Sequence, residues 1–309
     1  MRCGPWYGRA VPVPRHLGAV CCVLVAFGLG LSVPPRGAGA APRNPRPVAV
    51  VAAADLQYAL RDIAEAFRAV RPEIPVQLSF GSSGKFFTQI TQGLRADLFF
   101  SADTRFPERL EQAGLVEPGS RRLYAVGRMV IWARNDFLAR EKTSSPDPSF
   151  LTRPGVVRLA IANPVHAPYG RGALTLLEHY GLARRRTNVA WEKMQGTLET
   201  YFDFGPLRGG KPSFELILGE NISHAAQLAL TGTGVGILAL SIAKAEAMEA
   251  AGRYWLAPLA SHMRLEQAYV VLRGRNRPEV MAFYNFIASP RARAIFRRYG
   301  FLLPDEPAQ

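Results

Sequence analysis

The first folded part of the sequence alternates between apolar runs and amphipathic stretches, and this alternation limits the fold more than any other feature. Residues 48–54 are continuously apolar, which predicts a strand buried on both faces of a parallel sheet. Apolar side chains of residues 56–70 recur at helical spacing and predict a helix. Further strands are predicted over residues 75–80 and 96–102, with a helix between them. The order βαβαβ predicts an α/β fold built on a doubly wound, mostly parallel sheet.

A turn of small residues, Gly81 to Gly84, joins the second predicted strand to its helix. Such a turn exposes backbone N–H groups at a helix N-terminus, where the helix dipole adds partial positive charge. Ser82 and Ser83 add hydroxyl donors, so the turn is suited to an oxyanion. The alternative is that serine only caps the helix. A nucleotide-binding phosphate loop fits poorly, because Lys85 is followed by Phe86 rather than by serine or threonine.

A second α/β pattern follows a long apolar stretch, residues 124–133, which predicts a strand that crosses between two domains. Its first strand-to-helix turn carries Tyr169, and a later turn leads through Ile222 into another helix. The strand predicted at residues 266–272 can return to the first domain. The other elements predicted beyond residue 155 are strands at 156–162 and 234–240 and helices at 172–180, 242–251, 280–288 and 291–299.

Residues 199–216 mix aromatic side chains with glycine, proline and basic residues, which predicts an irregular insertion. It is interpreted as a plain surface hairpin, with a lid or a docking loop as the alternatives.

Composition indicates a folded protein with a preference for anionic partners. The chain has 309 residues, enough for two domains, and its formal net charge is +14. We find no helix-turn-helix, zinc-finger or RNA-recognition pattern, so nucleic acid is not the predicted partner. An anionic small ligand or a membrane surface fits the charge equally well.

The first 41 residues are predicted to be a secretory signal peptide. Basic residues lead into an apolar core at residues 17–33, and small residues allow cleavage after Ala40 or Ala41. The alternative is an uncleaved membrane anchor. All three cysteines lie in this leader, and the histidines beyond it are scattered singly. We therefore predict a mature protein without disulfides, metal sites or cofactors.

Several segments resemble the periplasmic molybdate-binding proteins of ABC importers. They occur in the same order as in that family and extend over nearly the whole mature chain. The matching segments are 52–56 (AAADL), 80–84 (FGSSG), 96–103 (ADLFFSAD), 163–164 (NP), 167–170 (APYG), 219–222 (GENI) and 296–301 (FRRYGF).

The resemblance implies a type II periplasmic-binding-protein fold of two α/β lobes that clamp a tetrahedral oxyanion. Lobe I is expected to comprise residues 42–127 and 266–304, and lobe II residues 128–265 with the insertion at 199–216. The implied protein is a periplasmic monomer and not an enzyme. It captures molybdate or tungstate and delivers the anion to an inner-membrane molybdate ABC permease.

Carried over by position, the resemblance implies ligand contacts at Asp55 and Ser83 in lobe I and at Tyr169 and the Ile222 backbone N–H in lobe II, with Ser82 beside them. These residues would contact the oxygen atoms of the anion rather than ligate the metal. Many relatives have Ser, Thr or Asn at the position of Asp55, and an ionised carboxylate would repel a dianion. We therefore expect the Asp55 side chain to point away as a helix cap, leaving its own N–H and that of Leu56 to bind.

A second departure is Ala239, where some relatives place a tyrosine that contacts the ligand, so Tyr169 is expected to supply the phenolic donor alone. The predicted mechanism is binding by neutral donors without chemistry. Three alternatives stay open: a binding protein for sulfate or phosphate, a periplasmic enzyme with Ser83 as nucleophile, and a sensing module that uses residues 199–216.

Overall fold

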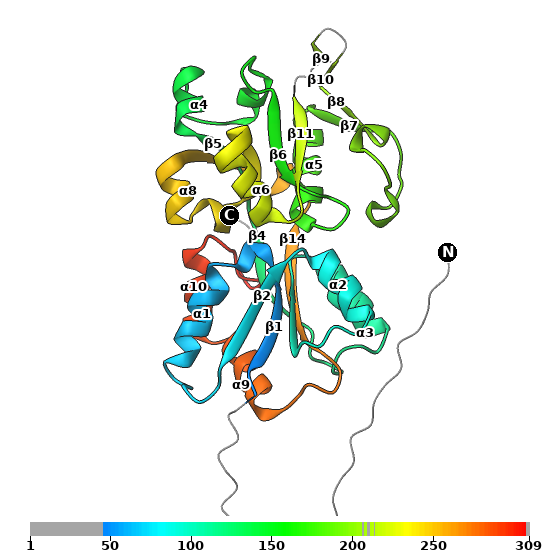
Figure 1. Cartoon of the computed structure of the whole chain (residues 1–309), viewed down its shortest axis with the longest axis vertical. Coiled ribbons are helices and arrows are strands. Elements are labelled where there is room, and N and C mark those ends of the chain that lie inside the picture. The colour runs from blue at the N-terminus through cyan, green and yellow to red at the C-terminus, as the bar shows by residue number, and fades with distance from the viewer. Residues whose placement is uncertain (1–45, 206, 209–210, 213, 307–309) are drawn as a thin grey trace, which may run out of the picture. The chain divides into compact units, whose positions relative to one another are not determined.

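The computed structural model describes residues 46–205, 207–208, 211–212 and 214–306. The predicted signal peptide lies outside these residues. Among the described residues, no helix is both long and apolar enough to cross a membrane. Residues 44–309 form one compact unit with two five-stranded sheets, each flanked by helices (Figure 1). This confirms the predicted two-lobed α/β fold.

The first sheet has the strand order β2-β1-β3-β14-β4. Its strands are β1 (Val48–Ala53), β2 (Val76–Gly81), β3 (Leu98–Ser101), β14 (Leu265–Val271) and β4 (Arg122–Gly127). The strands β2, β1 and β3 are parallel, whereas β14 runs antiparallel to both β3 and β4. The parallel part of the sheet is thus the predicted βαβαβ unit.

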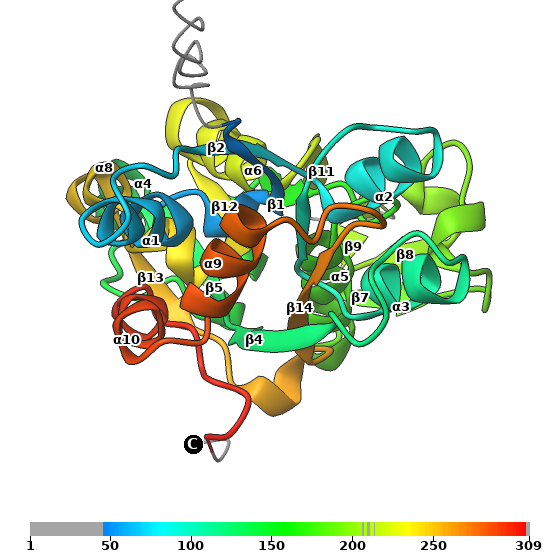
Figure 2. The same cartoon turned by 90° about the horizontal axis from the view of Figure 1, so that it is seen from below.

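Helices cover both faces of the first sheet. One face packs against α1 (Ala59–Arg68), α9 (Pro278–Phe286) and α10 (Pro290–Arg298), through a core that includes Ile63, Phe67 and Phe283. The other face packs against α2 (Ser83–Thr91) and α3 (Arg105–Gln112). Figure 2 shows the two groups of helices on opposite sides of the sheet.

The second sheet repeats this arrangement, with the strand order β11-β6-β12-β5-β13. Its strands are β11 (Glu215–Gly219), β6 (Arg158–Ala162), β12 (Val235–Ala239), β5 (Met129–Arg134) and β13 (Gly252–Leu256). Its helices are α4 (Asn135–Arg140), α5 (Pro168–His179), α6 (Ile222–Leu228), α7 (Leu240–Ala243) and α8 (Glu246–Ala251). Again three neighbouring strands, β11, β6 and β12, are parallel, whereas β5 runs antiparallel to both β12 and β13.

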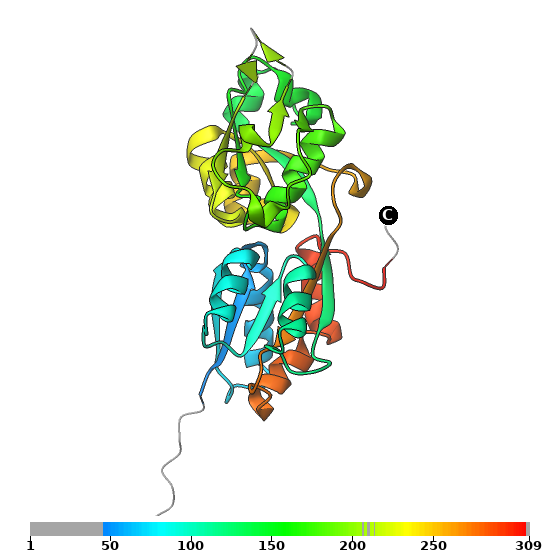
Figure 3. The same cartoon turned by 90° about the vertical axis from the view of Figure 1, so that its right-hand side faces the viewer.

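The chain passes between the sheets twice (Figure 3). The single strand predicted at residues 124–133 is two strands, β4 and β5, which belong to different sheets and are separated by Arg128. The return passage runs from β13 to β14. Leu265, at the start of β14, pairs with Gly127, at the end of β4, so the two connections lie side by side.

The predicted insertion at residues 199–216 has different limits in the structure. β8 (Phe202–Phe204) pairs with β7 (Ala183–Arg185), and β9 (Leu207–Arg208) pairs with β10 (Lys211–Pro212). Phe202 and Phe204 are buried, which explains the aromatic content of this segment. Residues 215–216 already belong to β11 of the second sheet, so the predicted limit at 216 is too late.

Candidate functional site

Five chain segments, three from the first sheet and two from the second, meet at one cavity. The first sheet contributes the turns after β1 and β2 and the end of β3, and the second sheet contributes the N-termini of α5 and α6. The residues that line the cavity are Ala53, Ala54, Asp55, Gly81, Ser82, Ser83, Ala102, Ala167, Pro168, Tyr169, Asn221 and Ile222. All five residues predicted to contact the ligand are therefore brought together.

Ser82 and Ser83 have different roles at the N-terminus of α2. Ser82 is the helix cap, and its Oγ accepts a hydrogen bond from the Lys85 N–H at 3.3 Å. The Oγ of Ser83 accepts a bond from the Ala102 N–H at 3.0 Å, which ties the turn to the end of β3. A hydroxyl that accepts a bond still has its own proton to donate. Both serines are buried at the cavity wall, where that proton can meet a ligand oxygen.

The expectation that the Asp55 side chain caps a helix is wrong. Asp55 lies inside a short helical turn (Ala54–Leu56) whose cap position is Ala53, and no side chain caps that turn. The carboxyl group is 1% exposed, and its Oδ2 accepts a hydrogen bond from Gln267 Nε2 at 2.7 Å. Burial raises the pKa of Asp55 to about 6, although hydrogen bonds from Gln267, Tyr169 and the local backbone act in the opposite direction.

Gln267 is a member of the site that sequence reasoning missed. It is fully buried on β14, and its Nε2 lies 2.7 Å from Asp55 Oδ2 and 3.2 Å from the Tyr169 hydroxyl. Its Oε1 accepts a hydrogen bond of 2.5 Å from the Tyr124 hydroxyl on β4. Gln267 directly follows Glu266 near the start of β14, so the sequence gives little signal that Gln267 is buried in the site.

Tyr169 reaches the cavity from the first turn of α5 and is 2% exposed. Its hydroxyl packs against Gly127, the last residue of β4. A Cβ at position 127 would lie 2.2 Å from this hydroxyl, so a larger residue there would displace it. Burial, followed by the nearby charge of Asp55, raises the pKa of Tyr169 well above its usual value. The phenol therefore keeps its proton at physiological pH and can act as a donor.

Ile222 is the first residue of α6, and its backbone N–H belongs to the N-terminal turn, whose amides lack partners within the helix. The cap is Asn221, whose Oδ1 accepts a hydrogen bond from the His224 N–H at 3.0 Å. Ala239 is fully buried in β12, and Leu240 directly after it begins α7.

Hydrogen bonds join the two sheets around the cavity. The Gly84 N–H donates to His166 O at 2.9 Å. From the second sheet, Ser223 Oγ donates to Ala54 O at 3.0 Å and Ser241 Oγ donates to Asp55 O at 2.8 Å. The structure thus has the two sheets closed over the cavity.

The cavity is small and has no cationic side chain in its wall. About 10 Å³ of it is open to the centre of a water molecule, roughly the room for one water. None of its lining residues is Lys, Arg or His. Within the described residues, no cluster of His, Cys, Asp and Glu could hold a metal ion. The wall therefore offers hydroxyl groups and helix N-termini, which suit an anion rather than a cation.

Residues 48–302 match the family model for the bacterial extracellular solute-binding protein. The chain belongs to this family. It is 30% identical to the molybdate-binding protein ModA of Rhodobacter capsulatus over 74% of this chain and 77% of the relative. It is 28% identical to ModA of Azotobacter vinelandii over 90% of this chain and 99% of the relative.

The solved structure of the Azotobacter vinelandii periplasmic molybdate-binding protein superposes with a TM-score of 0.66, at 26% identity, over 83% of this chain and 99% of that one. These relatives are named as molybdate-binding proteins, and the protein is a binding protein rather than an enzyme.

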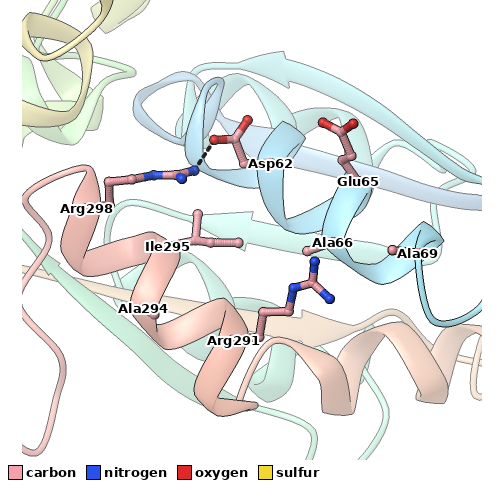
Figure 4. A pocket seen from close by; sticks show the side chains of 8 residues that line it. All are labelled: Asp62, Glu65, Ala66, Ala69, Arg291, Ala294, Ile295 and Arg298. Atoms are coloured by element: carbon pink, nitrogen blue, oxygen red, sulfur yellow. Dashed lines mark hydrogen bonds and ion pairs between the residues drawn. The ribbon is translucent and has the colours of Figure 1, made fainter.

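A larger hollow lies away from the predicted site, on the surface between α1 and α10 (Figure 4). Its wall carries charges of both signs, and Asp62 there pairs with Arg298 and accepts a hydrogen bond from the Tyr299 hydroxyl at 2.8 Å. Because Asp62 and Glu65 place negative charge beside its two arginines, this hollow is a poorer candidate for an anion site than the cavity.

Proposed function

We propose that the protein captures molybdate between its two sheets and delivers it to an ABC permease of the inner membrane. The observation that carries the proposal is the convergence of strand-to-helix turns from both sheets on one buried, cation-free cavity. The relatives named above are molybdate-binding proteins and match most of the chain.

Neutral donors hold the anion in this proposal. Ser83 and Ser82 donate hydroxyl protons, Tyr169 donates its phenol, and the first turns of α2 and α6 supply backbone N–H groups, among them that of Ile222. Neutral donors avoid the cost of burying a counter-charge beside the ligand. Tungstate shares the shape and charge of molybdate and is proposed as a second ligand.

Binding requires a small movement of the walls, because the closed cavity holds roughly one water and a tetrahedral oxyanion has four oxygen atoms. We propose that residues 42–127 with 266–304 and residues 128–265 move as the two lobes, and that β4–β5 and β13–β14 form the hinge. Cavity size and fixed donor positions then select against smaller oxyanions such as sulfate. Closure of the lobes marks the loaded state for the permease. The predicted leader would place the protein in the periplasm, where it acts as a monomer.

The test is calorimetric titration of the chain from residue 42 onward with molybdate, tungstate, sulfate and phosphate. Molybdate and tungstate are expected to bind, and sulfate and phosphate to bind weakly or not at all. A ligand at about 100 times its dissociation constant should stabilise the fold by roughly 2.7 kcal/mol, so thermal melts give an independent reading. Absence of binding by all four anions would refute the proposal.

Phosphate is a second candidate ligand because of Asp55. An ionised carboxylate only accepts hydrogen bonds, and a protonated oxyanion such as hydrogenphosphate can donate one to it. Tighter binding of phosphate than of molybdate in the same titration would favour this candidate.

A further inference from the structure

Asp55 places an acidic group in the wall of a cavity that is proposed to bind a dianion. The carboxyl group is 1% exposed, and its Oδ1 has no hydrogen-bond partner in the described part of the chain. A buried polar atom without a partner is uncommon in native proteins and calls for an explanation. In the ionised form the group would also repel the ligand.

The hydrogen bonds around Asp55 show what a proton there would change. Gln267 accepts from Tyr124 through Oε1, so its Nε2 is the donor that faces Asp55 and Tyr169. The Tyr169 oxygen therefore accepts from Gln267, and its single proton is free to go to an acceptor. While Asp55 is ionised, that proton has the carboxylate as a competing acceptor, and it cannot serve a ligand at the same time.

We infer that Asp55 is protonated in the loaded protein, so that each oxyanion is captured together with one proton. This inference rests on the proposed function. The proton turns the carboxylate from an acceptor into a donor and gives Oδ1 a hydrogen-bonding role. It also frees the Tyr169 hydroxyl to face the anion. One proton therefore supplies two donors and removes one negative charge from the site.

The surroundings of Asp55 supply phenols but no cation. The titratable side chains that face it are Tyr169 from α5 and Tyr124 from β4, with Gln267 from β14 between them. The hydrogen bonds that act on its pKa come from Gln267, Tyr169 and the local backbone, and burial, the largest effect, raises that pKa to about 6.

The charged side chains on neighbouring elements have partners of their own. Lys85 of α2 pairs with Glu220 at 3.1 Å. Arg171 of α5 lies 3.1 Å from Glu192 and 3.6 Å from Asp103. The charge balance of the cavity therefore depends on Asp55 itself.

The test measures proton uptake by the wild-type protein when molybdate binds. Titrations at pH 6, 7 and 8 are run in pairs of buffers that differ in ionisation enthalpy. With a pKa of about 6 in the free protein, linkage predicts an uptake of about 0.9 proton per anion at pH 7. The dissociation constant should rise by about 50-fold from pH 6 to pH 8.

Asp55→Asn is the decisive variant, since asparagine keeps the shape and a donor but cannot titrate. It should bind with a flat pH profile and without proton uptake. Protonation of the anion itself would appear equally in both proteins. The matched control is Asp62→Asn, another aspartate of the first lobe that lies outside the cavity, which should keep the wild-type profile.

The outcomes distinguish failure of the proton-uptake inference from failure of the proposed molybdate binding. Molybdate binding by the wild type without proton uptake overturns the inference and leaves the proposed function standing. A pH dependence that persists in Asp55→Asn also overturns it. Absence of binding by every oxyanion at every pH overturns both. If Asp55→Asn does not fold, the proton uptake of the wild-type protein alone decides.

Discussion

Replacing Asp55 by asparagine should stabilise the ligand-free protein at neutral pH. The pKa of Asp55 is raised from 3.8 to about 6, with burial as the main cause. The folded protein therefore binds more protons than the unfolded chain between these values, and its stability falls as the pH rises through this window. Because one pKa unit corresponds to about 1.36 kcal/mol, this rise in pKa lowers the free energy of unfolding by about 3 kcal/mol above pH 6.

Asparagine removes this penalty because it carries no charge at any pH. Its amide oxygen can accept the bond from Gln267 that Asp55 Oδ2 accepts now. At pH 4 the two proteins should have similar stability. At pH 7 the variant should be more stable by about 3 kcal/mol. Replacement of a buried polar residue usually destabilises a protein. A gain in stability in Asp55→Asn would therefore be informative whatever its size.

The free energy of unfolding of the wild type and of Asp55→Asn is measured by urea unfolding, without ligand, at several pH values between 4 and 8. Carboxylates whose pKa is lowered in the fold, such as Asp203 and Glu306, change the stability of both proteins equally and cancel. A difference that does not vary with pH would refute the reasoning, and so would a variant less stable than the wild type at pH 7.

Three further substitutions test the site and its closure. Ser83→Ala removes a proposed donor and the acceptor of the Ala102 N–H, and calorimetry should show affinity for molybdate lower by about 10- to 100-fold. Gly84→Ala places a Cβ 2.7 Å from His166 O, so small-angle scattering with ligand should show a less compact protein than the wild type. Gln267→Leu leaves the carboxyl and the phenol that it bonds unpaired, and urea unfolding should show a loss of about 2–5 kcal/mol. Unchanged affinity, compactness or stability would contradict the respective prediction.

The arrangement of elements could be predicted because burial on both faces leaves continuous apolar runs in the sequence. The central strands β1 and β3 are such runs, and both are buried along nearly their whole length. β13 was missed because it is a short edge strand whose residues Arg253 and Tyr254 are exposed, so its pattern resembles a loop. β7 is only three residues long and was missed for the same reason.

The site could be predicted only where local structure determines it. Ser82, Ser83, Tyr169 and Ile222 lie at turns between strands and helices, and such turns can be identified within a few residues of sequence. Asp55 also lies at such a turn, but its orientation depends on Gln267, which is 212 positions away. A local rule assigns Asp55 to helix capping, whereas a tertiary hydrogen bond holds its carboxyl group against Gln267 of β14.

The turns that line the cavity also form hydrogen bonds between the two sheets. Gly84 bonds His166 with its backbone, and the carbonyl groups of Ala54 and Asp55 accept bonds from serines of the second sheet. A hydrogen bond of this kind contributes about 1 kcal/mol, so the three together give the closed form of the ligand-free protein only a modest stability. An anion that bonds donors on both sides adds several more contacts across the same gap. A bound anion should therefore make the closed form markedly more stable, and this difference is what a permease needs in order to distinguish loaded from empty protein.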